Sequence, residues 1–339
     1  MDPGRTQHIE TVIVGGGQAG LSVGYHLTQS GRPFVILDAE DHIGDAWRRR
    51  WDSLRLFTPA RYDGLDGMPF PAPGHTFPTK DQMADYLQAY AERFRLPVLN
   101  GVRVDAVRRD GDAFVVDAGD QRYIADNVVV AMSSYQQPRL PDFAGQLDPG
   151  IVSLHSLHYR RPAQLQPGAV LIVGAGNSGA EIAMELAPTH SVLLSGRSTG
   201  HIPFRIEGWA SRFVLARIVL RGVFHRVLTV ATPIGRKVRP KVLGRGGPLI
   251  RVKPKDLAAA GVQRAGRLIG VRGGFPLLED RQTPQVANVI WCTGFHPGFS
   301  WIDLPVLDGD EPRHDAEPCR RRRGSTLWVC TSSTRCLPA

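Results

Sequence analysis

Short runs of apolar residues recur along the chain, and each run ends in glycines or polar residues. Residues 11–14 are followed by GGGQAG and then by LSVGYHL, in which the apolar positions repeat with helical spacing. Residues 169–173 are followed in the same way by GAGNSG and AEIAMEL. Because a continuous apolar run of this length is typical of a strand buried on both faces, both segments predict a strand, a tight turn and a helix.

Three further patterns predict how these units are completed. Thr79 and Gln82 have the spacing of a capping box, which predicts a helix over the following MADYLQAYAERF. Residues 98–130 alternate between apolar and polar positions around RRDGD and DAGDQ, which predicts a small antiparallel β meander whose last strand, NVVVAM, returns to the first sheet. The run in VANVIWCTGF predicts another buried strand, which we assign to that sheet as well.

The order of these elements predicts an α/β fold with two Rossmann-type dinucleotide-binding domains, each in three layers. The first domain is expected to comprise residues 1–160 and 286–313, with the second domain, residues 161–285, inserted between them. Residues 314–339 keep no apolar period and are expected to form an aberrant, disordered tail.

The glycines of the two loops form three pairs with shared roles. In such loops the first glycine permits the tight turn, the second lets the backbone approach a pyrophosphate, and the third lets helix and strand pack closely. The helix N-terminus adds N–H groups and a partial positive charge that favour phosphate. One such loop is a weak signal, but two in the strand-turn-helix context are specific. The candidate binding residues in the loops are Gly15, Gly17, Gly20, Gly174, Gly176, Asn177, Ser178 and Gly179.

The two loops differ in the charge of the residue expected at the adenosine ribose. Counting 23 residues from Gly15 reaches Asp38, and the same count from Gly174 reaches Arg197. An acid accepts hydrogen bonds from ribose hydroxyls, as FAD or NAD requires, whereas arginine favours the 2′-phosphate of NADP. The first loop is therefore predicted to hold FAD and the second NADPH. The alternative is that both are ordinary loop residues.

Composition and charge exclude several other classes of protein. The formal charge of +9 comes from 41 basic and 32 acidic residues, but the arginines are spread along the chain, so we expect no nucleic-acid stripe. No span reaches about 18 uncharged apolar residues, so no membrane-spanning helix is expected. The N-terminus has no apolar stretch of a secretory signal, so a cytoplasmic location is expected.

Two other features were weighed for additional chemistry. The four cysteines, Cys292, Cys319, Cys330 and Cys336, form no CxxC motif, which argues against a dithiol or zinc site. Residues 206–230 are apolar but carry several arginines. They predict a helix packed over the active site, or alternatively one that associates with acidic lipid at the membrane surface.

Taken together, the chain resembles the flavin-containing monooxygenases, in particular bacterial flavoproteins related to the plant YUCCA enzymes. The resemblance runs from Thr11 to about Arg313 through VIVGGGQAGL, IGDAWRRRWDSLRLFTPARY, GMPFP, FPTKDQMADYL, LIVGAGNSGAEIA, LSGR and VIWCTGF. It implies that Trp47 and Arg48 lie beside FAD, as in the family's GGxWR stretch. It also implies that Thr293 and Gly294, which match the family's ATGF strand end, lie near the flavin.

The resemblance implies a monooxygenase that uses FAD, NADPH and O₂ to oxidise a small organic substrate. NADPH would reduce FAD, and the flavin would insert one oxygen atom through a C4a-hydroperoxide. A reductase or oxidase without oxygen transfer and an inactive nucleotide-binding remnant are the alternatives. No catalytic residue is assigned, and the substrate and the oligomeric state, with a homodimer as one option, stay open.

Three departures from the family pattern bear on this interpretation. The FxGxxxHxxx(Y/F/W) signature lacks its Phe and gains one residue between Asp148 and Tyr159. Pro59 stands where many members carry an oxygen-handling Asn, and the first ATG strand end reads Ala131-Met132-Ser133. The signature's His155 and the nearby His158 are expected to be interdomain hinge residues, and no metal is expected because no third ligand is placed beside them.

The last residues, HDAEPCRRRRGSTLWVCTSSTRCLPA, do not match the strand GLYFVGLPFQHAL that relatives carry there. Back-translation in a frame displaced by two nucleotides permits VYALGLHFQHALP over residues 324–338. We therefore hypothesise a frameshift and expect this product to lack its last flavin-covering strand and helix. Such a loss of buried area would weaken FAD binding or folding.

Overall fold

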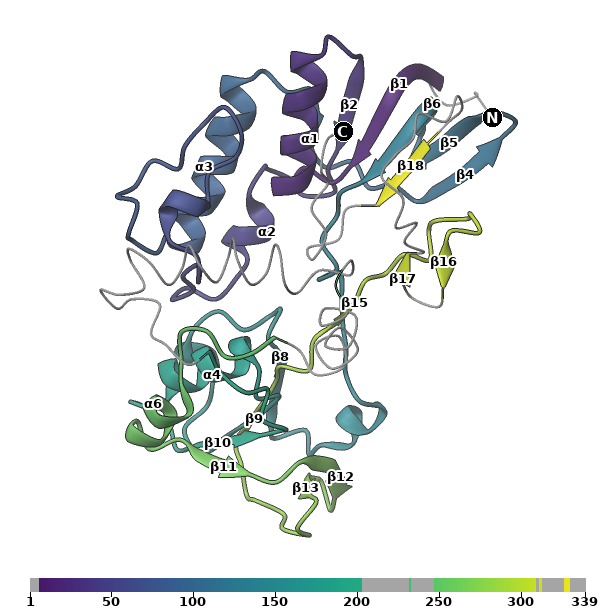
Figure 1. Ribbon diagram of the computed structural model, residues 1–339. Coiled ribbons are helices and arrows are strands. Elements are labelled where there is room, and N and C mark those ends of the chain that lie inside the picture. Colours follow the sequence, from purple (N-terminus) through teal and green to yellow (C-terminus); the bar gives the residue numbers. More distant parts are fainter. Residues whose placement is uncertain (1–5, 203–231, 233–246, 309–310, 313–325, 330–339) are drawn as a thin grey trace. The chain divides into compact units, whose positions relative to one another are not determined.

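The computed structural model describes residues 6–202, 232, 247–308, 311–312 and 326–329 of the 339-residue chain. The fold is α/β, and the chain divides into two compact units (Figure 1). The first unit comprises residues 1–49, 58–138 and 295–339, and the second comprises residues 50–57 and 139–294. The second unit is thus inserted into the first, and the sheet of each unit has parallel central strands, one of which leads into a glycine loop.

A seven-stranded sheet forms the first unit, in the order β3-β2-β1-β6-β5-β4, with β18 paired to β6. Three of the four buried residues of β1, Val12, Ile13 and Val14, are apolar, as expected for a central strand, and the fourth is Thr11. Its strands are β1 (Thr6–Val14), β2 (Phe34–Leu37), β3 (Val98–Leu99), β4 (Ala106–Asp110), β5 (Ala113–Ala118), β6 (Gln121–Val130) and β18 (Thr326–Val329). Its helices are α1 (Gln18–Gln29), α2 (Asp45–Arg48), α3 (Lys80–Arg93) and a 3₁₀ turn, Ala60–Tyr62.

Five parallel strands form the sheet of the second unit, in the order β11-β10-β9-β14-β8. The strands are β8 (Val152–His155), β9 (Val170–Val173), β10 (Val192–Ser195), β11 (Gln263–Ala265) and β14 (Asn288–Trp291). The helices are α4 (Asn177–Leu186) and α6 (Pro254–Ala259), with 3₁₀ turns at Asp142–Gln146 and Pro162–Gln164. A hairpin joins β12 (Leu268–Arg272) to β13 (Phe275–Leu278).

Short strands complete the described parts of the first unit. β7 (Gln137–Pro138) pairs antiparallel with β15 (Phe295–His296), so the segments that lead into and out of the second unit are joined side by side. β16 (Leu307–Asp308) pairs antiparallel with β17 (Glu311–Pro312).

The predicted local elements are confirmed where they were strongest. The Thr79 side chain accepts from the Gln82 N–H (3.2 Å) and the Gln82 side chain accepts from the Thr79 N–H (2.9 Å), which completes the capping box of α3. β4, β5 and β6 form the antiparallel meander. β6 also pairs in parallel with β1, from Arg122 to Val130, so the meander returns to the sheet as expected.

The predicted domain limits need correction at three places. We assigned residues 286–313 to the first domain, but β14 lies between β9 and β8 in the second sheet. β8, at 152–155, also belongs to that sheet. The excursion 50–57 belongs to the second unit, and its Trp51 is buried in that unit's core. The reason is that an apolar run predicts a buried strand without saying which sheet it completes, since strand pairing depends on backbone bonds alone.

The expected loss of the last strand is also wrong, because part of the tail pairs with the first sheet. β5 pairs with β6 only from Gln121 to Ala125, and β18 pairs with β6 in parallel from Asn127 to Val130. Any extended segment can take such a place, because the backbone supplies the hydrogen bonds. The other residues of 314–339, and the hypothesised frameshift with them, lie outside what the structure describes.

Candidate cofactor-binding sites

The first glycine loop is shaped by close backbone contacts on the β6 side. Gly15 has a positive φ of +109°, and a Cβ added there would lie 2.9 Å from the Ala131 carbonyl carbon. The Gly15 N–H donates to the Leu37 carbonyl (2.8 Å), and the Ala131 N–H donates to the Val14 carbonyl (2.8 Å). The turn therefore accepts only glycine at this position, as predicted for the tight turn.

Space is distributed differently at the two other glycines of this loop. A Cβ at Gly20 would lie 1.9 Å from the Gly15 carbonyl oxygen, so helix and loop are already in contact there. At Gly17, the N-cap of α1, an added Cβ would meet nothing within 4 Å, and the cap has no side-chain hydrogen bond. The backbone at Gly17 is thus open, with first-turn N–H groups directed away from the helix, which fits a pyrophosphate.

Asp38 is held against this loop. One carboxylate oxygen accepts from the Gly16 N–H (3.0 Å) and the other from the Glu40 N–H (3.1 Å). Burial raises the pKa of Asp38, and these two hydrogen bonds act in the opposite direction. Each carboxylate oxygen has two lone pairs, so the oriented group keeps capacity to accept from ribose hydroxyls.

The second glycine loop repeats the first in detail. Gly174 has φ +115°, its N–H donates to the Ser195 carbonyl (2.8 Å), and an added Cβ would lie 2.2 Å from the Cys292 carbonyl oxygen. A Cβ at Gly179 would lie 1.9 Å from the Gly174 carbonyl oxygen. At Gly176, the N-cap of α4, it would meet nothing within 4 Å. A second open cradle for a pyrophosphate is therefore present.

The residue count that aligned Asp38 with Arg197 is wrong by one position. Val14 on β1 pairs with Leu37, whereas Val173, its equivalent on β9, pairs with Ser195. The first residue after the strand is thus Asp38 in the first unit and Gly196 in the second. Arg197 follows one residue later, and its side chain is exposed. The count failed because α4 is two residues shorter than α1, while the connection from the helix to the next strand is one residue longer in the second unit.

Asn177, a predicted cofactor-binding residue, makes its described contacts to another part of the chain. Its side-chain amide donates to the Pro248 carbonyl (3.0 Å) and accepts from the Ile250 N–H (2.9 Å). The buried Lys253 ammonium then donates to the carbonyls of Ile250 (2.7 Å) and Ile202 (3.0 Å). Asn177 therefore anchors residues 248–250 beside the second loop. Its neighbour Ser178 is half-buried at the start of α4.

Arg48 is committed to packing in the first unit. Its guanidinium donates to the Ile43 carbonyl (2.8 Å) and to the side chains of Asp45 (3.2 Å), Asp85 (3.0 Å) and Gln88 (3.1 Å). These bonds fasten α2 to α3. Trp47, on the same short helix, is half-buried. The sequence signal for a residue beside FAD thus coincides with a structural clamp, and the cofactor role of both residues remains a prediction.

Thr293 and Gly294 lie at the carboxyl end of β14, in the second unit. The Thr293 hydroxyl donates to the Arg139 carbonyl, while the Gly294 carbonyl accepts from the Arg139 N–H (3.0 Å). His155 accepts from the Leu157 N–H at Nδ1 (3.1 Å), so its Nε2 is the atom that donates to the Gly294 carbonyl (3.1 Å). Burial lowers the pKa of His155, in keeping with a neutral ring. The positions that match the family's ATGF are therefore tied into the second sheet.

Cys292 also lies at this strand end, next to Gly174. Burial raises the pKa of its thiol to about 12, so the thiol stays protonated at neutral pH. A protonated thiol is a poor nucleophile. Cys292 is accordingly suited to packing and not to disulfide exchange.

The first unit contains a buried acid that the sequence does not mark. Asp63 is only 7% exposed, one of its oxygens accepts from the Thr58 hydroxyl, and the other has no hydrogen-bond partner in the described structure. Burial raises its pKa to about 6. Neither motif nor spacing marks this residue, since an isolated aspartate before a glycine is typical of a turn.

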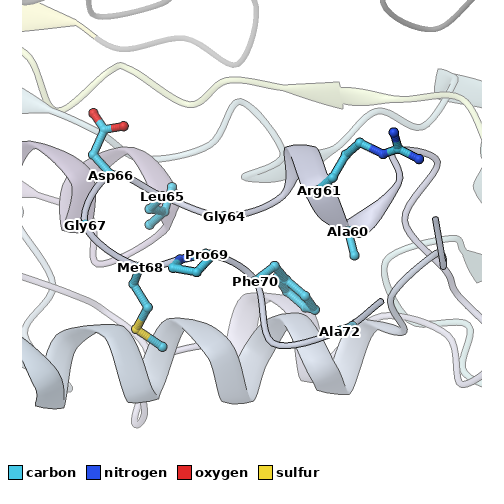
Figure 2. Close-up of a pocket in the computed structure, with 10 residues that line it drawn as sticks. All are labelled: Ala60, Arg61, Gly64, Leu65, Asp66, Gly67, Met68, Pro69, Phe70 and Ala72. Carbon is cyan, nitrogen blue, oxygen red and sulfur yellow. The ribbon is translucent and has the colours of Figure 1, made fainter. Parts of the chain in front are cut away.

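Residues next to Asp63 line an open cavity of about 570 Å³ in the first unit. Figure 2 shows the charged side chains of Arg61 and Asp66 toward opposite ends of this lining, with Phe70 between them. The lining is Ala60, Arg61, Gly64, Leu65, Asp66, Gly67, Met68, Pro69, Phe70 and Ala72.

Metal binding and membrane crossing can be judged for the described residues. In the described ranges, no cluster of three or more His, Cys, Asp or Glu side chains could hold a metal ion. No described helix has the length and apolar character needed to cross a membrane. The basic apolar segment 206–230, by contrast, lies outside the described residues.

Comparison with known proteins places these features among the flavoproteins. The family profile of the pyridine nucleotide-disulphide oxidoreductases matches residues 12–205. A CzcO-like oxidoreductase from Geobacillus kaustophilus is 36% identical over 93% of this chain and 88% of its own. Indole-3-pyruvate monooxygenase YUCCA1 from Oryza sativa is 34% identical over 86% and 78%. The flavin-containing monooxygenase from Stenotrophomonas maltophilia matches at 30% identity and a TM-score of 0.66, over 95% and 90%.

Proposed function

The chain belongs to the pyridine nucleotide-disulphide oxidoreductase family, and from this premise we propose that it is an FAD-dependent, NADPH-consuming monooxygenase. The substrates would be O₂ and a small organic molecule. A cytoplasmic location stays a prediction, and a homodimer is one assembly the chain allows.

One observation carries the proposal: the chain contains two complete dinucleotide cradles with the same contacts, one next to an acid and the other next to an arginine. In the first, Asp38 is oriented by Gly16 and can accept from the ribose hydroxyls of FAD. In the second, Arg197 can pair with the 2′-phosphate of NADPH. The open backbones at Gly17 and Gly176 leave room for the two pyrophosphates.

The chemistry itself would come from the cofactors. Bound FAD would accept a hydride from NADPH and then activate O₂ for transfer to the substrate. The chain itself would bind both nucleotides and orient Asp38. The hydrogen bond between His155 and Gly294 would hold the carboxyl end of β14 in place.

Disulfide reduction, which the family name also covers, is not supported by this chain. Its four cysteines form no CxxC pair. Cys292, next to the second loop, is buried and protonated. The proposal therefore follows the monooxygenases among the similar proteins and not the disulfide reductases.

An NADPH oxidase without oxygen transfer is the second candidate. Pro59 favours it, because this position carries no side chain that could hydrogen-bond to an oxygen intermediate, whereas an Asn would. The Thr58 hydroxyl next to it is already engaged by Asp63.

The test begins with protein purified and reconstituted with FAD, with rates of NADPH and NADH oxidation compared. Candidate substrates, including indole-3-pyruvate as the substrate in the name of the YUCCA relative and simple thioethers, are then supplied under ¹⁸O₂. A monooxygenase incorporates one ¹⁸O atom into the product for each NADPH consumed. Release of one hydrogen peroxide for each NADPH consumed, with the organic substrate recovered unchanged, would instead establish the oxidase, and failure to take up FAD would refute both.

A further inference from the structure

The edge of the second sheet carries a second arginine close to Arg197. β11 lies outside β10, and Arg264 pairs in register with Leu194, two residues before Gly196. The Arg264 Nη2 donates to the Gly196 carbonyl at 2.6 Å. Arg264 thus reaches along the sheet edge to the peptide group that joins Gly196 to Arg197.

This peptide group has little freedom. Gly196 has φ +131°, and a Cβ added there would lie 3.1 Å from the Ala175 N atom of the glycine loop. The backbone must therefore keep a conformation that glycine adopts readily and other residues do not. With its carbonyl held by Arg264, the direction in which the chain enters Arg197 is set.

The chain that follows Arg264 is also held in place by hydrogen bonds. The buried Ser195 hydroxyl donates to the Gly266 carbonyl (2.7 Å) and accepts from the Leu268 N–H (3.0 Å). These bonds tie the end of β10 to the turn that follows β11. Arg264, on β11, and Arg197, two residues after β10, are consequently attached to strand ends that these hydrogen bonds hold together.

The charges at this edge have no acidic partner in the part of the chain that the structure describes. Among those residues, neither Arg197 nor Arg264 forms an ion pair, whereas Arg161 pairs with Asp52 and Arg251 with Glu181 in the same unit. Both side chains are exposed. Positive charges attached to one strand edge without an acid repel each other, and an anion bound at that edge relieves the repulsion.

We propose that Arg264 is a specificity-determining residue for the phosphorylated nucleotide: it positions Arg197 through the Gly196 carbonyl and gives the 2′-phosphate a second positive charge. The inference rests on the proposed binding of NADPH by the second unit. It adds a residue from β11 to a recognition site that would otherwise depend on the loop after β10 alone.

The experiment measures binding of 2′,5′-ADP and of 5′-AMP by calorimetry to the FAD-reconstituted full-length protein, together with KM and kcat for NADPH and NADH. The variants are Arg264→Gln, Arg264→Lys and Arg197→Gln. The control is Arg272→Gln, an exposed arginine at the end of β12 in the same unit. Retained FAD and unchanged circular dichroism show that each variant is folded.

Arg264→Gln is expected to weaken 2′,5′-ADP binding about 10- to 100-fold, the range for loss of a charge-assisted contact, and to leave 5′-AMP binding unchanged. KM for NADPH should rise while kcat and KM for NADH stay constant. Arg264→Lys should recover part of the affinity, since it keeps the charge without the fork geometry, and Arg272→Gln should match the parent protein.

Two outcomes overturn the proposal in different ways. If the parent protein prefers 2′,5′-ADP and Arg264→Gln keeps that preference in full, the role of Arg264 is refuted and NADPH binding is not. If the parent protein does not prefer 2′,5′-ADP over 5′-AMP, the NADPH assignment itself fails, and the inference fails with it.

Discussion

In the first unit, the residue that follows the second strand is an acid bonded to the glycine loop, whereas in the second unit it is a glycine with φ +131°. The rest of the two motifs matches closely: sheet order, turn contacts, helix caps and the spacing of three glycines. The comparison teaches that the phosphate cradle is a constant part. The ribose-recognising group, by contrast, moves by one residue, and we infer that it gains a partner from the neighbouring strand.

A second difference concerns the strand next to the crossover. β14 is flanked by β8, which precedes the motif in the chain, whereas β6 is flanked by β5 and by β18 from the tail. The position beside β14 is thus filled by a strand that precedes the glycine loop in the sequence. The corresponding position beside β6 is filled in part by a strand from the C-terminal region.

The largest effect is expected from substituting the third glycine of each loop, which lies against the carbonyl oxygen of the first. Gly20→Ala and Gly179→Ala each place a methyl group 1.9 Å from a backbone oxygen that cannot move away, so each should cost about 3 kcal/mol or more of stability. Gly20→Ala should abolish FAD retention, and Gly179→Ala should abolish binding of NADPH. Visible spectra, calorimetry and urea unfolding measure these losses. Gly176→Ala, where space is open, is the matched control for folding, and equal stability of Gly179→Ala would contradict the contact.

The next effect concerns the buried carboxyl group of Asp63 in the first unit. The folded pKa of Asp63 is about 6, against about 3.9 for an unfolded chain, so the folded state binds more protons between pH 4 and pH 6. Stability must therefore fall as the pH rises through that window, by up to about 3 kcal/mol. Asp63→Asn should remove this fall and stabilise the protein at pH 8, while the Asn oxygen can still accept from Thr58.

Urea unfolding at pH 4.5 and pH 8 checks this expectation. Asp66→Asn is the control, because the Asp66 side chain is 73% exposed. A parent protein whose stability is the same at both pH values, or an Asp63→Asn variant that is weaker at pH 8, would be incompatible with a buried carboxyl of raised pKa.

The smallest effect sharpens the comparison itself by changing the two recognition residues separately. Asp38→Asn removes a charge that accepts from Gly16 and Glu40 and should weaken FAD binding about tenfold, which corresponds to about 1.4 kcal/mol, with KM for NADPH unchanged. Arg197→Gln should raise KM for NADPH by a similar factor and leave FAD binding intact. Titration with FAD and steady-state kinetics measure the two quantities. A variant that weakens the binding of FAD and of NADPH equally would mean that the two glycine-loop cradles do not bind different nucleotides as proposed.

Several site features could be predicted from the sequence because their causes are local. Gly15 and Gly174 need positive φ at a strand-to-helix turn, and such a turn is encoded by neighbouring residues. The capping box of α3 is likewise local, since both partners lie within four residues. The same reasoning did not anticipate the contacts of Arg48 with Asp85 and of Asn177 with Pro248, because these partners lie far away in the chain and have no signature in the motif. The cofactor roles of Arg48 and Asn177 remain predictions.

The chain's local pattern was enough to establish two nucleotide cradles, their glycine chemistry and the α/β class, because sterics and side-chain periodicity act over a few residues. Folding in three dimensions decided that β8 and β14 complete the second sheet, that β18 joins β6, and that Arg197 follows Gly196 at the strand end. It also decided that Asp63 is buried and that Arg264 reaches Gly196. These outcomes depend on backbone pairing and burial between distant segments, which no spacing along the chain encodes.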